Sequence, residues 1–207
     1  MNIILLGPPG AGKGTVAGSI KTAFEGILHL STGDLLRGEI KKGSELGLKA
    51  KAVIDKGELV PDEIIIGMVE KIIEENKGGI MFDGFPRTVA QAEALSEIAK
   101  IDMAIMLDAD EDVVTKRMCT RRVCKECGGV YNITLLKGDK CEACGGELMI
   151  RPDDNEETAR ERFKVYIKNT APLVEYYEKK GVLVKVDANR HFSEVAKDVI
   201  EALDKVK

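Results

Sequence analysis

A glycine-rich segment near the start of the chain has the spacing of a phosphate-binding loop. Residues 7–15 read GPPGAGKGT, directly after an apolar run and before a stretch with helical character. Backbone N–H groups in such a loop point inward, and the positive end of the following helix adds to the attraction for phosphate. Lys13 supplies a charge for the β- and γ-phosphates of a nucleotide. This order of features favours a nucleotide site over a glycine-rich turn that binds nothing.

The loop departs from the strict pattern G-x-x-x-x-G-K-[ST] at one position. Gly14 follows the lysine, so the hydroxyl arrives one residue later, at Thr15. The glycines permit a close approach of the backbone to phosphate. The predicted contacts to the triphosphate come from Gly10, Ala11, Gly12, Lys13, Gly14 and Thr15.

An acidic residue follows a second buried run. Asp83 ends the segment GIMFD, and a carboxylate at that edge of a parallel sheet can hold Mg²⁺ through its water shell. The alternative is an ordinary turn aspartate before Gly84. Because Asp83 is expected beside the phosphate loop, we favour the magnesium site over the turn aspartate.

Several arginines flank the loops expected at the same edge. A phosphoryl group in transfer spreads negative charge over several oxygens, and a planar guanidinium can hold two oxygens at once. Any single arginine is more often a solvated surface residue. The candidates are Arg37, Arg87, Arg117, Arg121, Arg151 and Arg162.

Four cysteines form two matched pairs in the middle of the chain. They are Cys124, Cys127, Cys141 and Cys144, and each C-x-x-C is followed by two glycines that allow a tight turn. This spacing predicts a tetrahedral Zn²⁺ site, which is structural because four thiolates leave no open position. A redox pair is the rival, but it requires a helix beginning at the first cysteine. Cys119 stands apart as an expected small buried residue.

The zinc segment lacks the features of a nucleic-acid ribbon. Its lysines at 125, 137 and 140 are balanced by acidic residues at 126, 139 and 142, and Tyr131 is its one aromatic residue. A basic surface interleaved with aromatic residues is therefore missing. A lid of roughly 35 residues is too small to build its own core, so zinc would make it stiff without making it large.

The whole chain alternates short apolar runs with amphipathic stretches, the pattern of a parallel α/β sheet covered on both faces. We predict strands at 2–6, 27–30, 79–82, 103–107 and 182–186. Ser31 and Thr32 are candidate caps of a helix that ends at Gly43. A long helical region follows Asp154, which has the spacing of a capping residue, and Pro172 bends or divides it. His29 and His191 are interpreted as structural.

Composition restricts the class of protein. The 207 residues are 44% hydrophobic and 32% charged, with a net charge of −4, which gives no general attraction to nucleic acid or membrane. No apolar run approaches the ~20 residues that span a bilayer. The first residues resemble a buried strand more than a signal peptide, and paired cysteines without secretory signals favour a reducing cytoplasm.

The motifs together resemble those of the adenylate kinases, in the long-lid, zinc-bearing form. The matching segments are GPPGAGKGT, STGDLLR, FDGFPRT with AQAEAL, RRVC with CGG, and RPDDNEET, in order over nearly the whole chain. The resemblance implies a P-loop NTPase-type fold with a five-stranded parallel sheet. It also implies a core of residues 1–30, 61–121 and 159–207, a nucleoside monophosphate-binding insertion at 31–60 and a zinc-binding lid at 122–158.

The same resemblance implies the reversible conversion of MgATP and AMP into two ADP, by a monomer. Lys13, Arg87, Arg121, Arg151 and Arg162 match the catalytic residues, and Arg117 and Arg121 match ATP contacts. Asp153 and Asp154 match a pair that orients arginines. The implied AMP contacts are Thr32, Arg37, Glu58, Val60, Gly84, Arg87, Gln91, Arg151 and Arg162.

Two positions depart from the family pattern. Thr120 precedes Arg121 where the family usually has glycine, and Pro152 follows Arg151 where a flexible residue is usual; both bear on lid motion.

Two other functions stay open. Within the class, a kinase preferring UMP or CMP, or GTP as donor, is the first alternative. A zinc-ribbon NTPase that couples hydrolysis to a macromolecule is the second.

Overall fold

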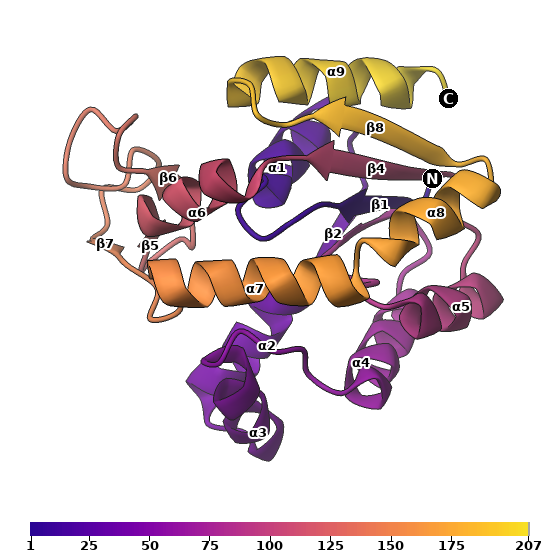
Figure 1. The fold of residues 1–207 in the computed structure, drawn as a ribbon, viewed down its shortest axis with the longest axis horizontal. Helices are drawn as coiled ribbons and strands as arrows, with labels where there is room; N and C mark the ends of the chain where they lie inside the picture. Colours follow the sequence, from indigo (N-terminus) through magenta and orange to yellow (C-terminus); the bar gives the residue numbers. More distant parts are fainter. Residues whose placement is uncertain (207) are drawn as a thin grey trace.

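The computed structural model describes residues 1–206, which are built around a five-stranded parallel sheet (Figure 1). The strand order is β2-β3-β1-β4-β8, so β1 lies in the middle between β3 and β4. Each predicted strand is present within one residue of its expected bounds. The strands are β1 (Ile3–Leu6), β2 (Leu28–Ser31), β3 (Ile80–Asp83), β4 (Met103–Asp108) and β8 (Leu183–Asp187).

Helices cover both faces of this sheet, because successive side chains of a strand point to opposite faces. Ile3 and Leu5 pack into a core with α1 (Lys13–Ala23) and α9 (Phe192–Asp204), two helices that contact each other on this face; α9 lies at the top of Figure 1. Ile4 and Leu6 belong to a second core on the opposite face. The helices that contribute to the second core include α4 (Asp62–Glu75), α5 (Val89–Ile98), α7 (Glu156–Asn169) and α8 (Pro172–Lys179).

The first insertion is a pair of helices, α2 (Thr32–Lys42) and α3 (Glu45–Ile54). Ser31 caps α2, since its side chain accepts a hydrogen bond from the backbone N–H of Asp34 at 3.3 Å. The other candidate cap, Thr32, is the first helical residue. Gly43 ends the helix in the left-handed conformation with φ +68°, as predicted.

The second insertion is a small antiparallel sheet of order β6-β5-β7 between α6 (Glu111–Cys119) and α7. Its strands are β5 (Arg121–Cys124), β6 (Val130–Asn132) and β7 (Leu148–Met149). This sheet projects to one side of the main body in Figure 1. Cys119, expected to be buried, is the last residue of α6 and is half-buried.

The long helical region after the lid corrects one prediction and confirms another. The cap of α7 is Asn155, whose side chain accepts from the N–H of Thr158 at 2.9 Å; Asp154, the predicted cap, instead turns its carboxylate to Arg121. Pro172 divides the region, because α7 ends at Asn169 and α8 begins at the proline. Across residues 1–206, each helix is too short or too polar to cross a bilayer.

Candidate active site and metal centre

The glycine-rich loop connects the end of β1 to α1, which begins at Lys13. The Nζ atom of Lys13 donates to the carbonyl oxygens of Gly7 at 2.8 Å and Pro8 at 2.9 Å, so the side chain folds back over the loop. A Cβ atom on Gly10 would lie 2.7 Å from the carbonyl oxygen of Val114 in α6. The glycine therefore lets the loop sit against α6, and a side chain there would push the loop away.

Lys13 lies in an electropositive environment that an anion would relieve. Burial, the largest cause, lowers the pKa of Lys13 to about 8, although Asp83 acts in the opposite direction. Arg87, Arg162 and Arg121 lower it further, because they lie close enough to repel a second cation. These three arginines come from separate segments of the chain, and they converge beside the phosphate loop.

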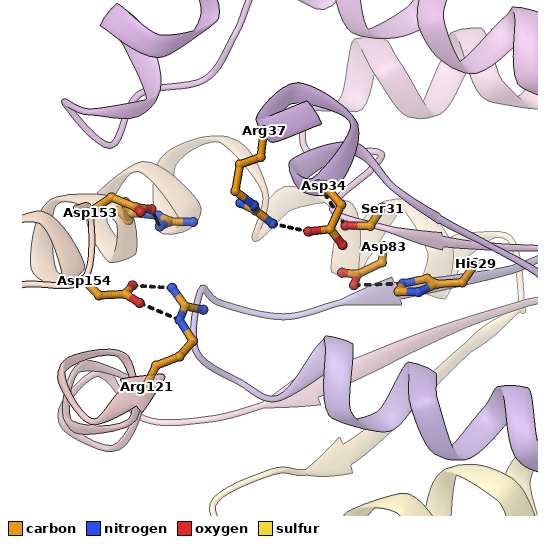
Figure 2. Close-up of polar contacts among 9 residues, drawn as sticks. His29, Ser31, Asp34, Arg37, Asp83, Arg121, Asp153 and Asp154 are labelled. Carbon is orange, nitrogen blue, oxygen red and sulfur yellow. Dashed lines mark hydrogen bonds and ion pairs between the residues drawn. The ribbon is translucent and has the colours of Figure 1, made fainter. Parts of the chain in front are cut away.

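Two arginines are held by adjacent carboxylates before α7. The guanidinium of Arg121 makes a two-point contact with Asp154, donating from Nε at 2.7 Å and also from Nη2, as Figure 2 shows. The Nη1 atom of Arg162 donates to Asp153 at 2.5 Å. Both aspartates are buried. A carboxylate pair of this kind fixes a guanidinium in one orientation, as the resemblance implied.

The remaining arginines lie at the rim of the same space. Arg37 donates to Asp34 at 2.5 Å on α2 (Figure 2). Burial lowers the pKa of Arg151 to about 10, and Arg121 and Arg37 add repulsion. Burial likewise lowers the pKa of Arg87 to about 10, with Arg162 as the next cause. Guanidinium groups stay protonated near neutral pH, so these shifts describe cations that are buried and that also repel one another.

A pocket next to these cations brings together the residues that the sequence assigned to a second nucleotide. Arg87 and Thr32 both donate to the carbonyl oxygen of Gly84 at 2.8 Å, through Nε and Oγ1 respectively. Gly84 has φ +75°, and a Cβ there would lie 2.9 Å from Nη2 of Arg87. The predicted residues that line the pocket are Thr32, Arg37, Glu58, Val60, Gly84, Arg87, Gln91 and Arg162. Arg151 does not line it.

Gln91, also in this pocket, is held from two sides. Its Oε1 accepts from the backbone N–H of Arg87 at 2.7 Å, and its Nε2 donates to Asp62 at 2.7 Å. Asp62 is the first residue of α4 and also accepts from the hydroxyl of Thr88 at 2.8 Å. The sequence reasoning did not single out Asp62, because 29 residues separate it from Gln91.

Asp83 lies at the end of β3, as predicted, with a neighbour that the sequence reasoning treated as purely structural. The Nε2 atom of His29, on the adjacent strand β2, lies 3.2 Å from Oδ2 of Asp83 (Figure 2). His29 pairs with Met81 and Ser31 pairs with Asp83, so the side chains of His29 and Asp83 lie on the same face of the sheet, two positions apart in register. Alternation along the strand is the signal that could have found this contact, once the strand pairing was known.

Arg117 lies apart from the pocket, on α6. Its guanidinium donates to the carbonyl oxygens of Ala188 at 2.8 Å and Arg190 at 3.1 Å, in the loop after β8. Burial lowers its pKa. The two carbonyls hold the guanidinium plane in place.

The four paired cysteines form one compact cluster, whose sulfur atoms all lie within 4.8 Å of one another. The two halves have matching turns: the backbone N–H of Gly128 donates to the carbonyl oxygen of Cys124, and that of Gly145 donates to the carbonyl oxygen of Cys141. Both glycines have positive φ, at +73° and +71°, which explains the glycine pairs seen in the sequence.

The chemistry of the donor set fits Zn²⁺. The hydroxyl of Tyr131, 3.1 Å from the sulfur of Cys141, is the main cause that lowers the pKa of Cys141 to about 6. At Cys144, the N–H of Gly146 favours the thiolate, but hydrogen bonds with the other three thiols raise the pKa to about 12. Four thiolates so close together require a cation between them, and Zn²⁺ accepts this tetrahedral set.

The sequence matches the family described as adenylate kinase over residues 5–182. That match spans most of the chain. The chain belongs to the adenylate kinase family.

Curated relatives agree with this adenylate kinase assignment. The chain is 49% identical to an adenylate kinase of Archaeoglobus fulgidus, over 100% of both chains. It is 49% identical to an adenylate kinase of Bacillus licheniformis over 98% of each chain, and 47% identical to one of Thermosipho melanesiensis over 98% of this chain and 99% of the relative. The protein is therefore a phosphotransferase with nucleotide substrates, and the zinc-lid subtype is compatible with its cysteine cluster.

Proposed function

We propose that the protein transfers the γ-phosphate of MgATP reversibly to AMP, giving two ADP. One observation carries the proposal: Arg87 and Arg162 line a pocket and are also close enough to Lys13 of the phosphate loop to lower its pKa, so the pocket and the loop share one group of cations. Two nucleotide sites that share one cluster of cations suit phosphoryl transfer between nucleotides better than hydrolysis.

The donor nucleotide would lie along the phosphate loop. We assign its β- and γ-phosphates to Lys13 and to the backbone N–H groups of residues 10–15. Arg121 would hold the transferred phosphoryl group, and Arg117 would stack on the base. The donor base is poorly encoded, since much of its surroundings is backbone.

The acceptor would occupy the neighbouring pocket. Arg37 and Arg87 would hold its α-phosphate, and Gln91 would contact the edge of its base. The backbone of Glu58 and Val60, together with Gly84 and Thr32, would enclose the nucleoside. Thr32 and Gln91 are the residues that favour AMP over UMP and CMP.

The chain's part in the reaction would be positioning and charge stabilisation. Arg121, Arg151 and Arg162 would surround the transferring group, where negative charge spreads over its oxygens. Asp153 and Asp154 keep two of these guanidinium groups oriented, so little reorganisation is needed during transfer. Transfer from one phosphate to another needs little acid–base chemistry, and no histidine has to act as a base.

Two metals would assist in different ways. Asp83 would hold Mg²⁺ through water, and the ion would neutralise charge on the donor phosphates. The four cysteines would hold Zn²⁺ and stiffen the lid of residues 122–158, so that it moves as a unit and shuts out water. The lid and the insertion at 31–60 would close over the core of residues 1–30, 61–121 and 159–207.

The setting follows from the same proposal. Thiolate ligands favour a reducing compartment, so we propose a cytoplasmic enzyme that balances AMP, ADP and ATP and serves nucleotide salvage. It would act as a monomer, as the resemblance to the family implies.

Product analysis with single acceptors tests the proposal. The protein is mixed with ATP, Mg²⁺ and AMP, UMP, CMP or GMP in turn, and nucleotides are separated by chromatography. We expect two ADP per ATP–AMP pair, with the pyrimidine acceptors poor. Inorganic phosphate that accumulates whatever the acceptor would indicate an NTPase and contradict the proposal.

A further inference from the structure

Asp62 accepts a hydrogen bond from Gln91, a residue that lines the acceptor pocket. An ionised carboxylate accepts and does not donate, so the atom of Gln91 that lies 2.7 Å away must be the amide nitrogen. The backbone N–H of Arg87 can only donate, so the atom of Gln91 at 2.7 Å from it must be the amide oxygen. The two partners together fix which end of the amide is oxygen and which is nitrogen.

The other residues around Asp62 keep its carboxylate in place. The Thr88 hydroxyl donates to Oδ2 at 2.8 Å while Gln91 occupies Oδ1, so each carboxylate oxygen has its own partner. Thr88 is itself the cap of α5 and accepts from the N–H of Gln91 at 3.2 Å. Asp62 on α4 and Gln91 on α5 are thus joined at the two helix starts, and Gln91 is buried with 2% of its surface exposed.

A glutamine held in this way offers the pocket a fixed pattern. After its two contacts, the amide retains one N–H and one oxygen lone pair for a ligand. Adenine presents an N–H donor at position 6 and an acceptor at N1, which complement that pair. Hypoxanthine has nearly the same shape but presents the reverse, an oxygen acceptor at position 6 and a donor at N1.

We propose that Asp62 is a positioning residue that determines the specificity of the acceptor site for adenine over 6-oxopurines. This inference rests on the proposed function of Gln91 as the residue that contacts the acceptor base. A 6-oxopurine would fit if the amide turned over. If the Gln91 amide turned over, its oxygen would face the ionised carboxylate of Asp62 and its NH₂ group would face the backbone N–H of Arg87. Both contacts are repulsive, so they disfavour the turned orientation.

The isosteric variant Asp62→Asn tests this directly. An asparagine amide can donate or accept, so it removes the conflict at position 62, and only the backbone N–H of Arg87 still opposes the flipped amide of Gln91. We expect the ratio of kcat/KM for AMP to kcat/KM for IMP to fall about tenfold, which corresponds to about 1.4 kcal/mol, since a buried polar group that faces the wrong partner is costly. The KM for ATP should not change, because Asp62 lies on the acceptor side.

The matched control is Glu63→Gln, which removes the same charge from the first turn of α4 at an exposed position. It should keep the AMP to IMP ratio of the wild type. A merely structural role for Asp62 would lower both activities together in Asp62→Asn and leave the ratio unchanged, which would overturn the inference. Thermal melting is measured for each variant.

Two further outcomes are distinguishable. If Asp62→Asn does not fold, Thr88→Val provides the test, because it removes the hydroxyl that holds Asp62; the ratio should fall in the same direction by a smaller factor, and an unchanged ratio counts against the inference. If the wild type fails to phosphorylate AMP, the proposed function itself fails and this inference falls with it. If the wild type prefers AMP and the variants keep that preference, only the inference is wrong.

Discussion

At the scale of single residues, the site is a concentration of buried cations that its carboxylates only partly balance. Asp153 and Asp154 each engage one arginine, whereas burial lowers the pKa of both Arg87 and Arg151 to about 10. The folded protein without nucleotide therefore carries an electrostatic cost that phosphate groups relieve. Active sites commonly hold such a cost, because the groups that bind a substrate are not arranged for stability.

The lowered pKa of Lys13 makes the free energy of unfolding depend on pH. Its pKa of about 8 in the folded protein lies below the ordinary 10.5, so above pH 8 the unfolded chain binds more protons, and the penalty from Lys13 fades as pH rises toward 10.5. We expect the melting temperature of Lys13→Met minus that of the wild type to decrease as pH rises from 7 to about 10. Lys21→Met, an exposed lysine of the same helix, is the control. A difference that grows with pH would contradict the prediction.

Asp154 is expected to contribute to both stability and rate. Its side chain is fully buried against Arg121, so Asp154→Asn leaves a partly unpaired buried cation and lets the guanidinium turn. We expect a roughly tenfold or larger loss of kcat and a lower melting temperature, because misplaced catalytic groups forfeit preorganisation. Glu157→Gln, which removes a negative charge at an exposed position three residues away, should keep the kcat and the melting temperature of the wild type. Equal kcat values for the two variants would show that the pair is not needed.

At the scale of elements, the second insertion has short strands and exposed apolar side chains. Its strands are two to four residues long, and several of its apolar side chains, such as Val130, Ile133 and Leu135, are exposed. The cysteine cluster joins the turn after β5 to the turn before β7, which ties both ends of the insertion together. Such a small unit needs a metal or another staple to stay ordered.

Removal of the metal is therefore expected to loosen the lid and to spare the sheet. Chelation should increase hydrogen exchange at β5, β6 and β7 and abolish most of the activity, while amides of β1 and β4 stay protected. Cys124→Ser should have the same effect, and Cys119→Ser, outside the cluster, should not. Loss of the whole fold in one step would contradict a local role for the metal.

The elements also show what a sequence reveals and what it hides. The phosphate loop, the five strands and the cysteine pairs were predictable, because each depends on residues within a short stretch. The Asp83–His29 and Asp62–Gln91 contacts join residues 54 and 29 positions apart, so they depend on strand pairing and helix packing. Asp154 had two expected roles, and the helix cap indicated by its spacing was wrong. Its contact with Arg121, 33 residues away, was implied only by the family resemblance.

At the scale of the whole molecule, the parallel sheet gathers distant segments at one edge. The phosphate loop follows β1, Asp83 ends β3, and α2 begins at the end of β2. The turn after α3 reaches across to α7, since a Cβ on Gly57 would lie 2.8 Å from Cγ of Arg162. The pocket thus depends on several elements at once, and the proposed closure of either insertion would change the surroundings of the same cations.

The central claim is that one nucleotide site passes a phosphoryl group directly to the other. The reverse reaction tests it most directly: the protein is incubated with Mg²⁺ and ADP alone, and the products are followed by ³¹P NMR. We predict that ATP and AMP appear in equal amounts, without inorganic phosphate. AMP and phosphate formed without ATP, or no reaction at all, would contradict the account.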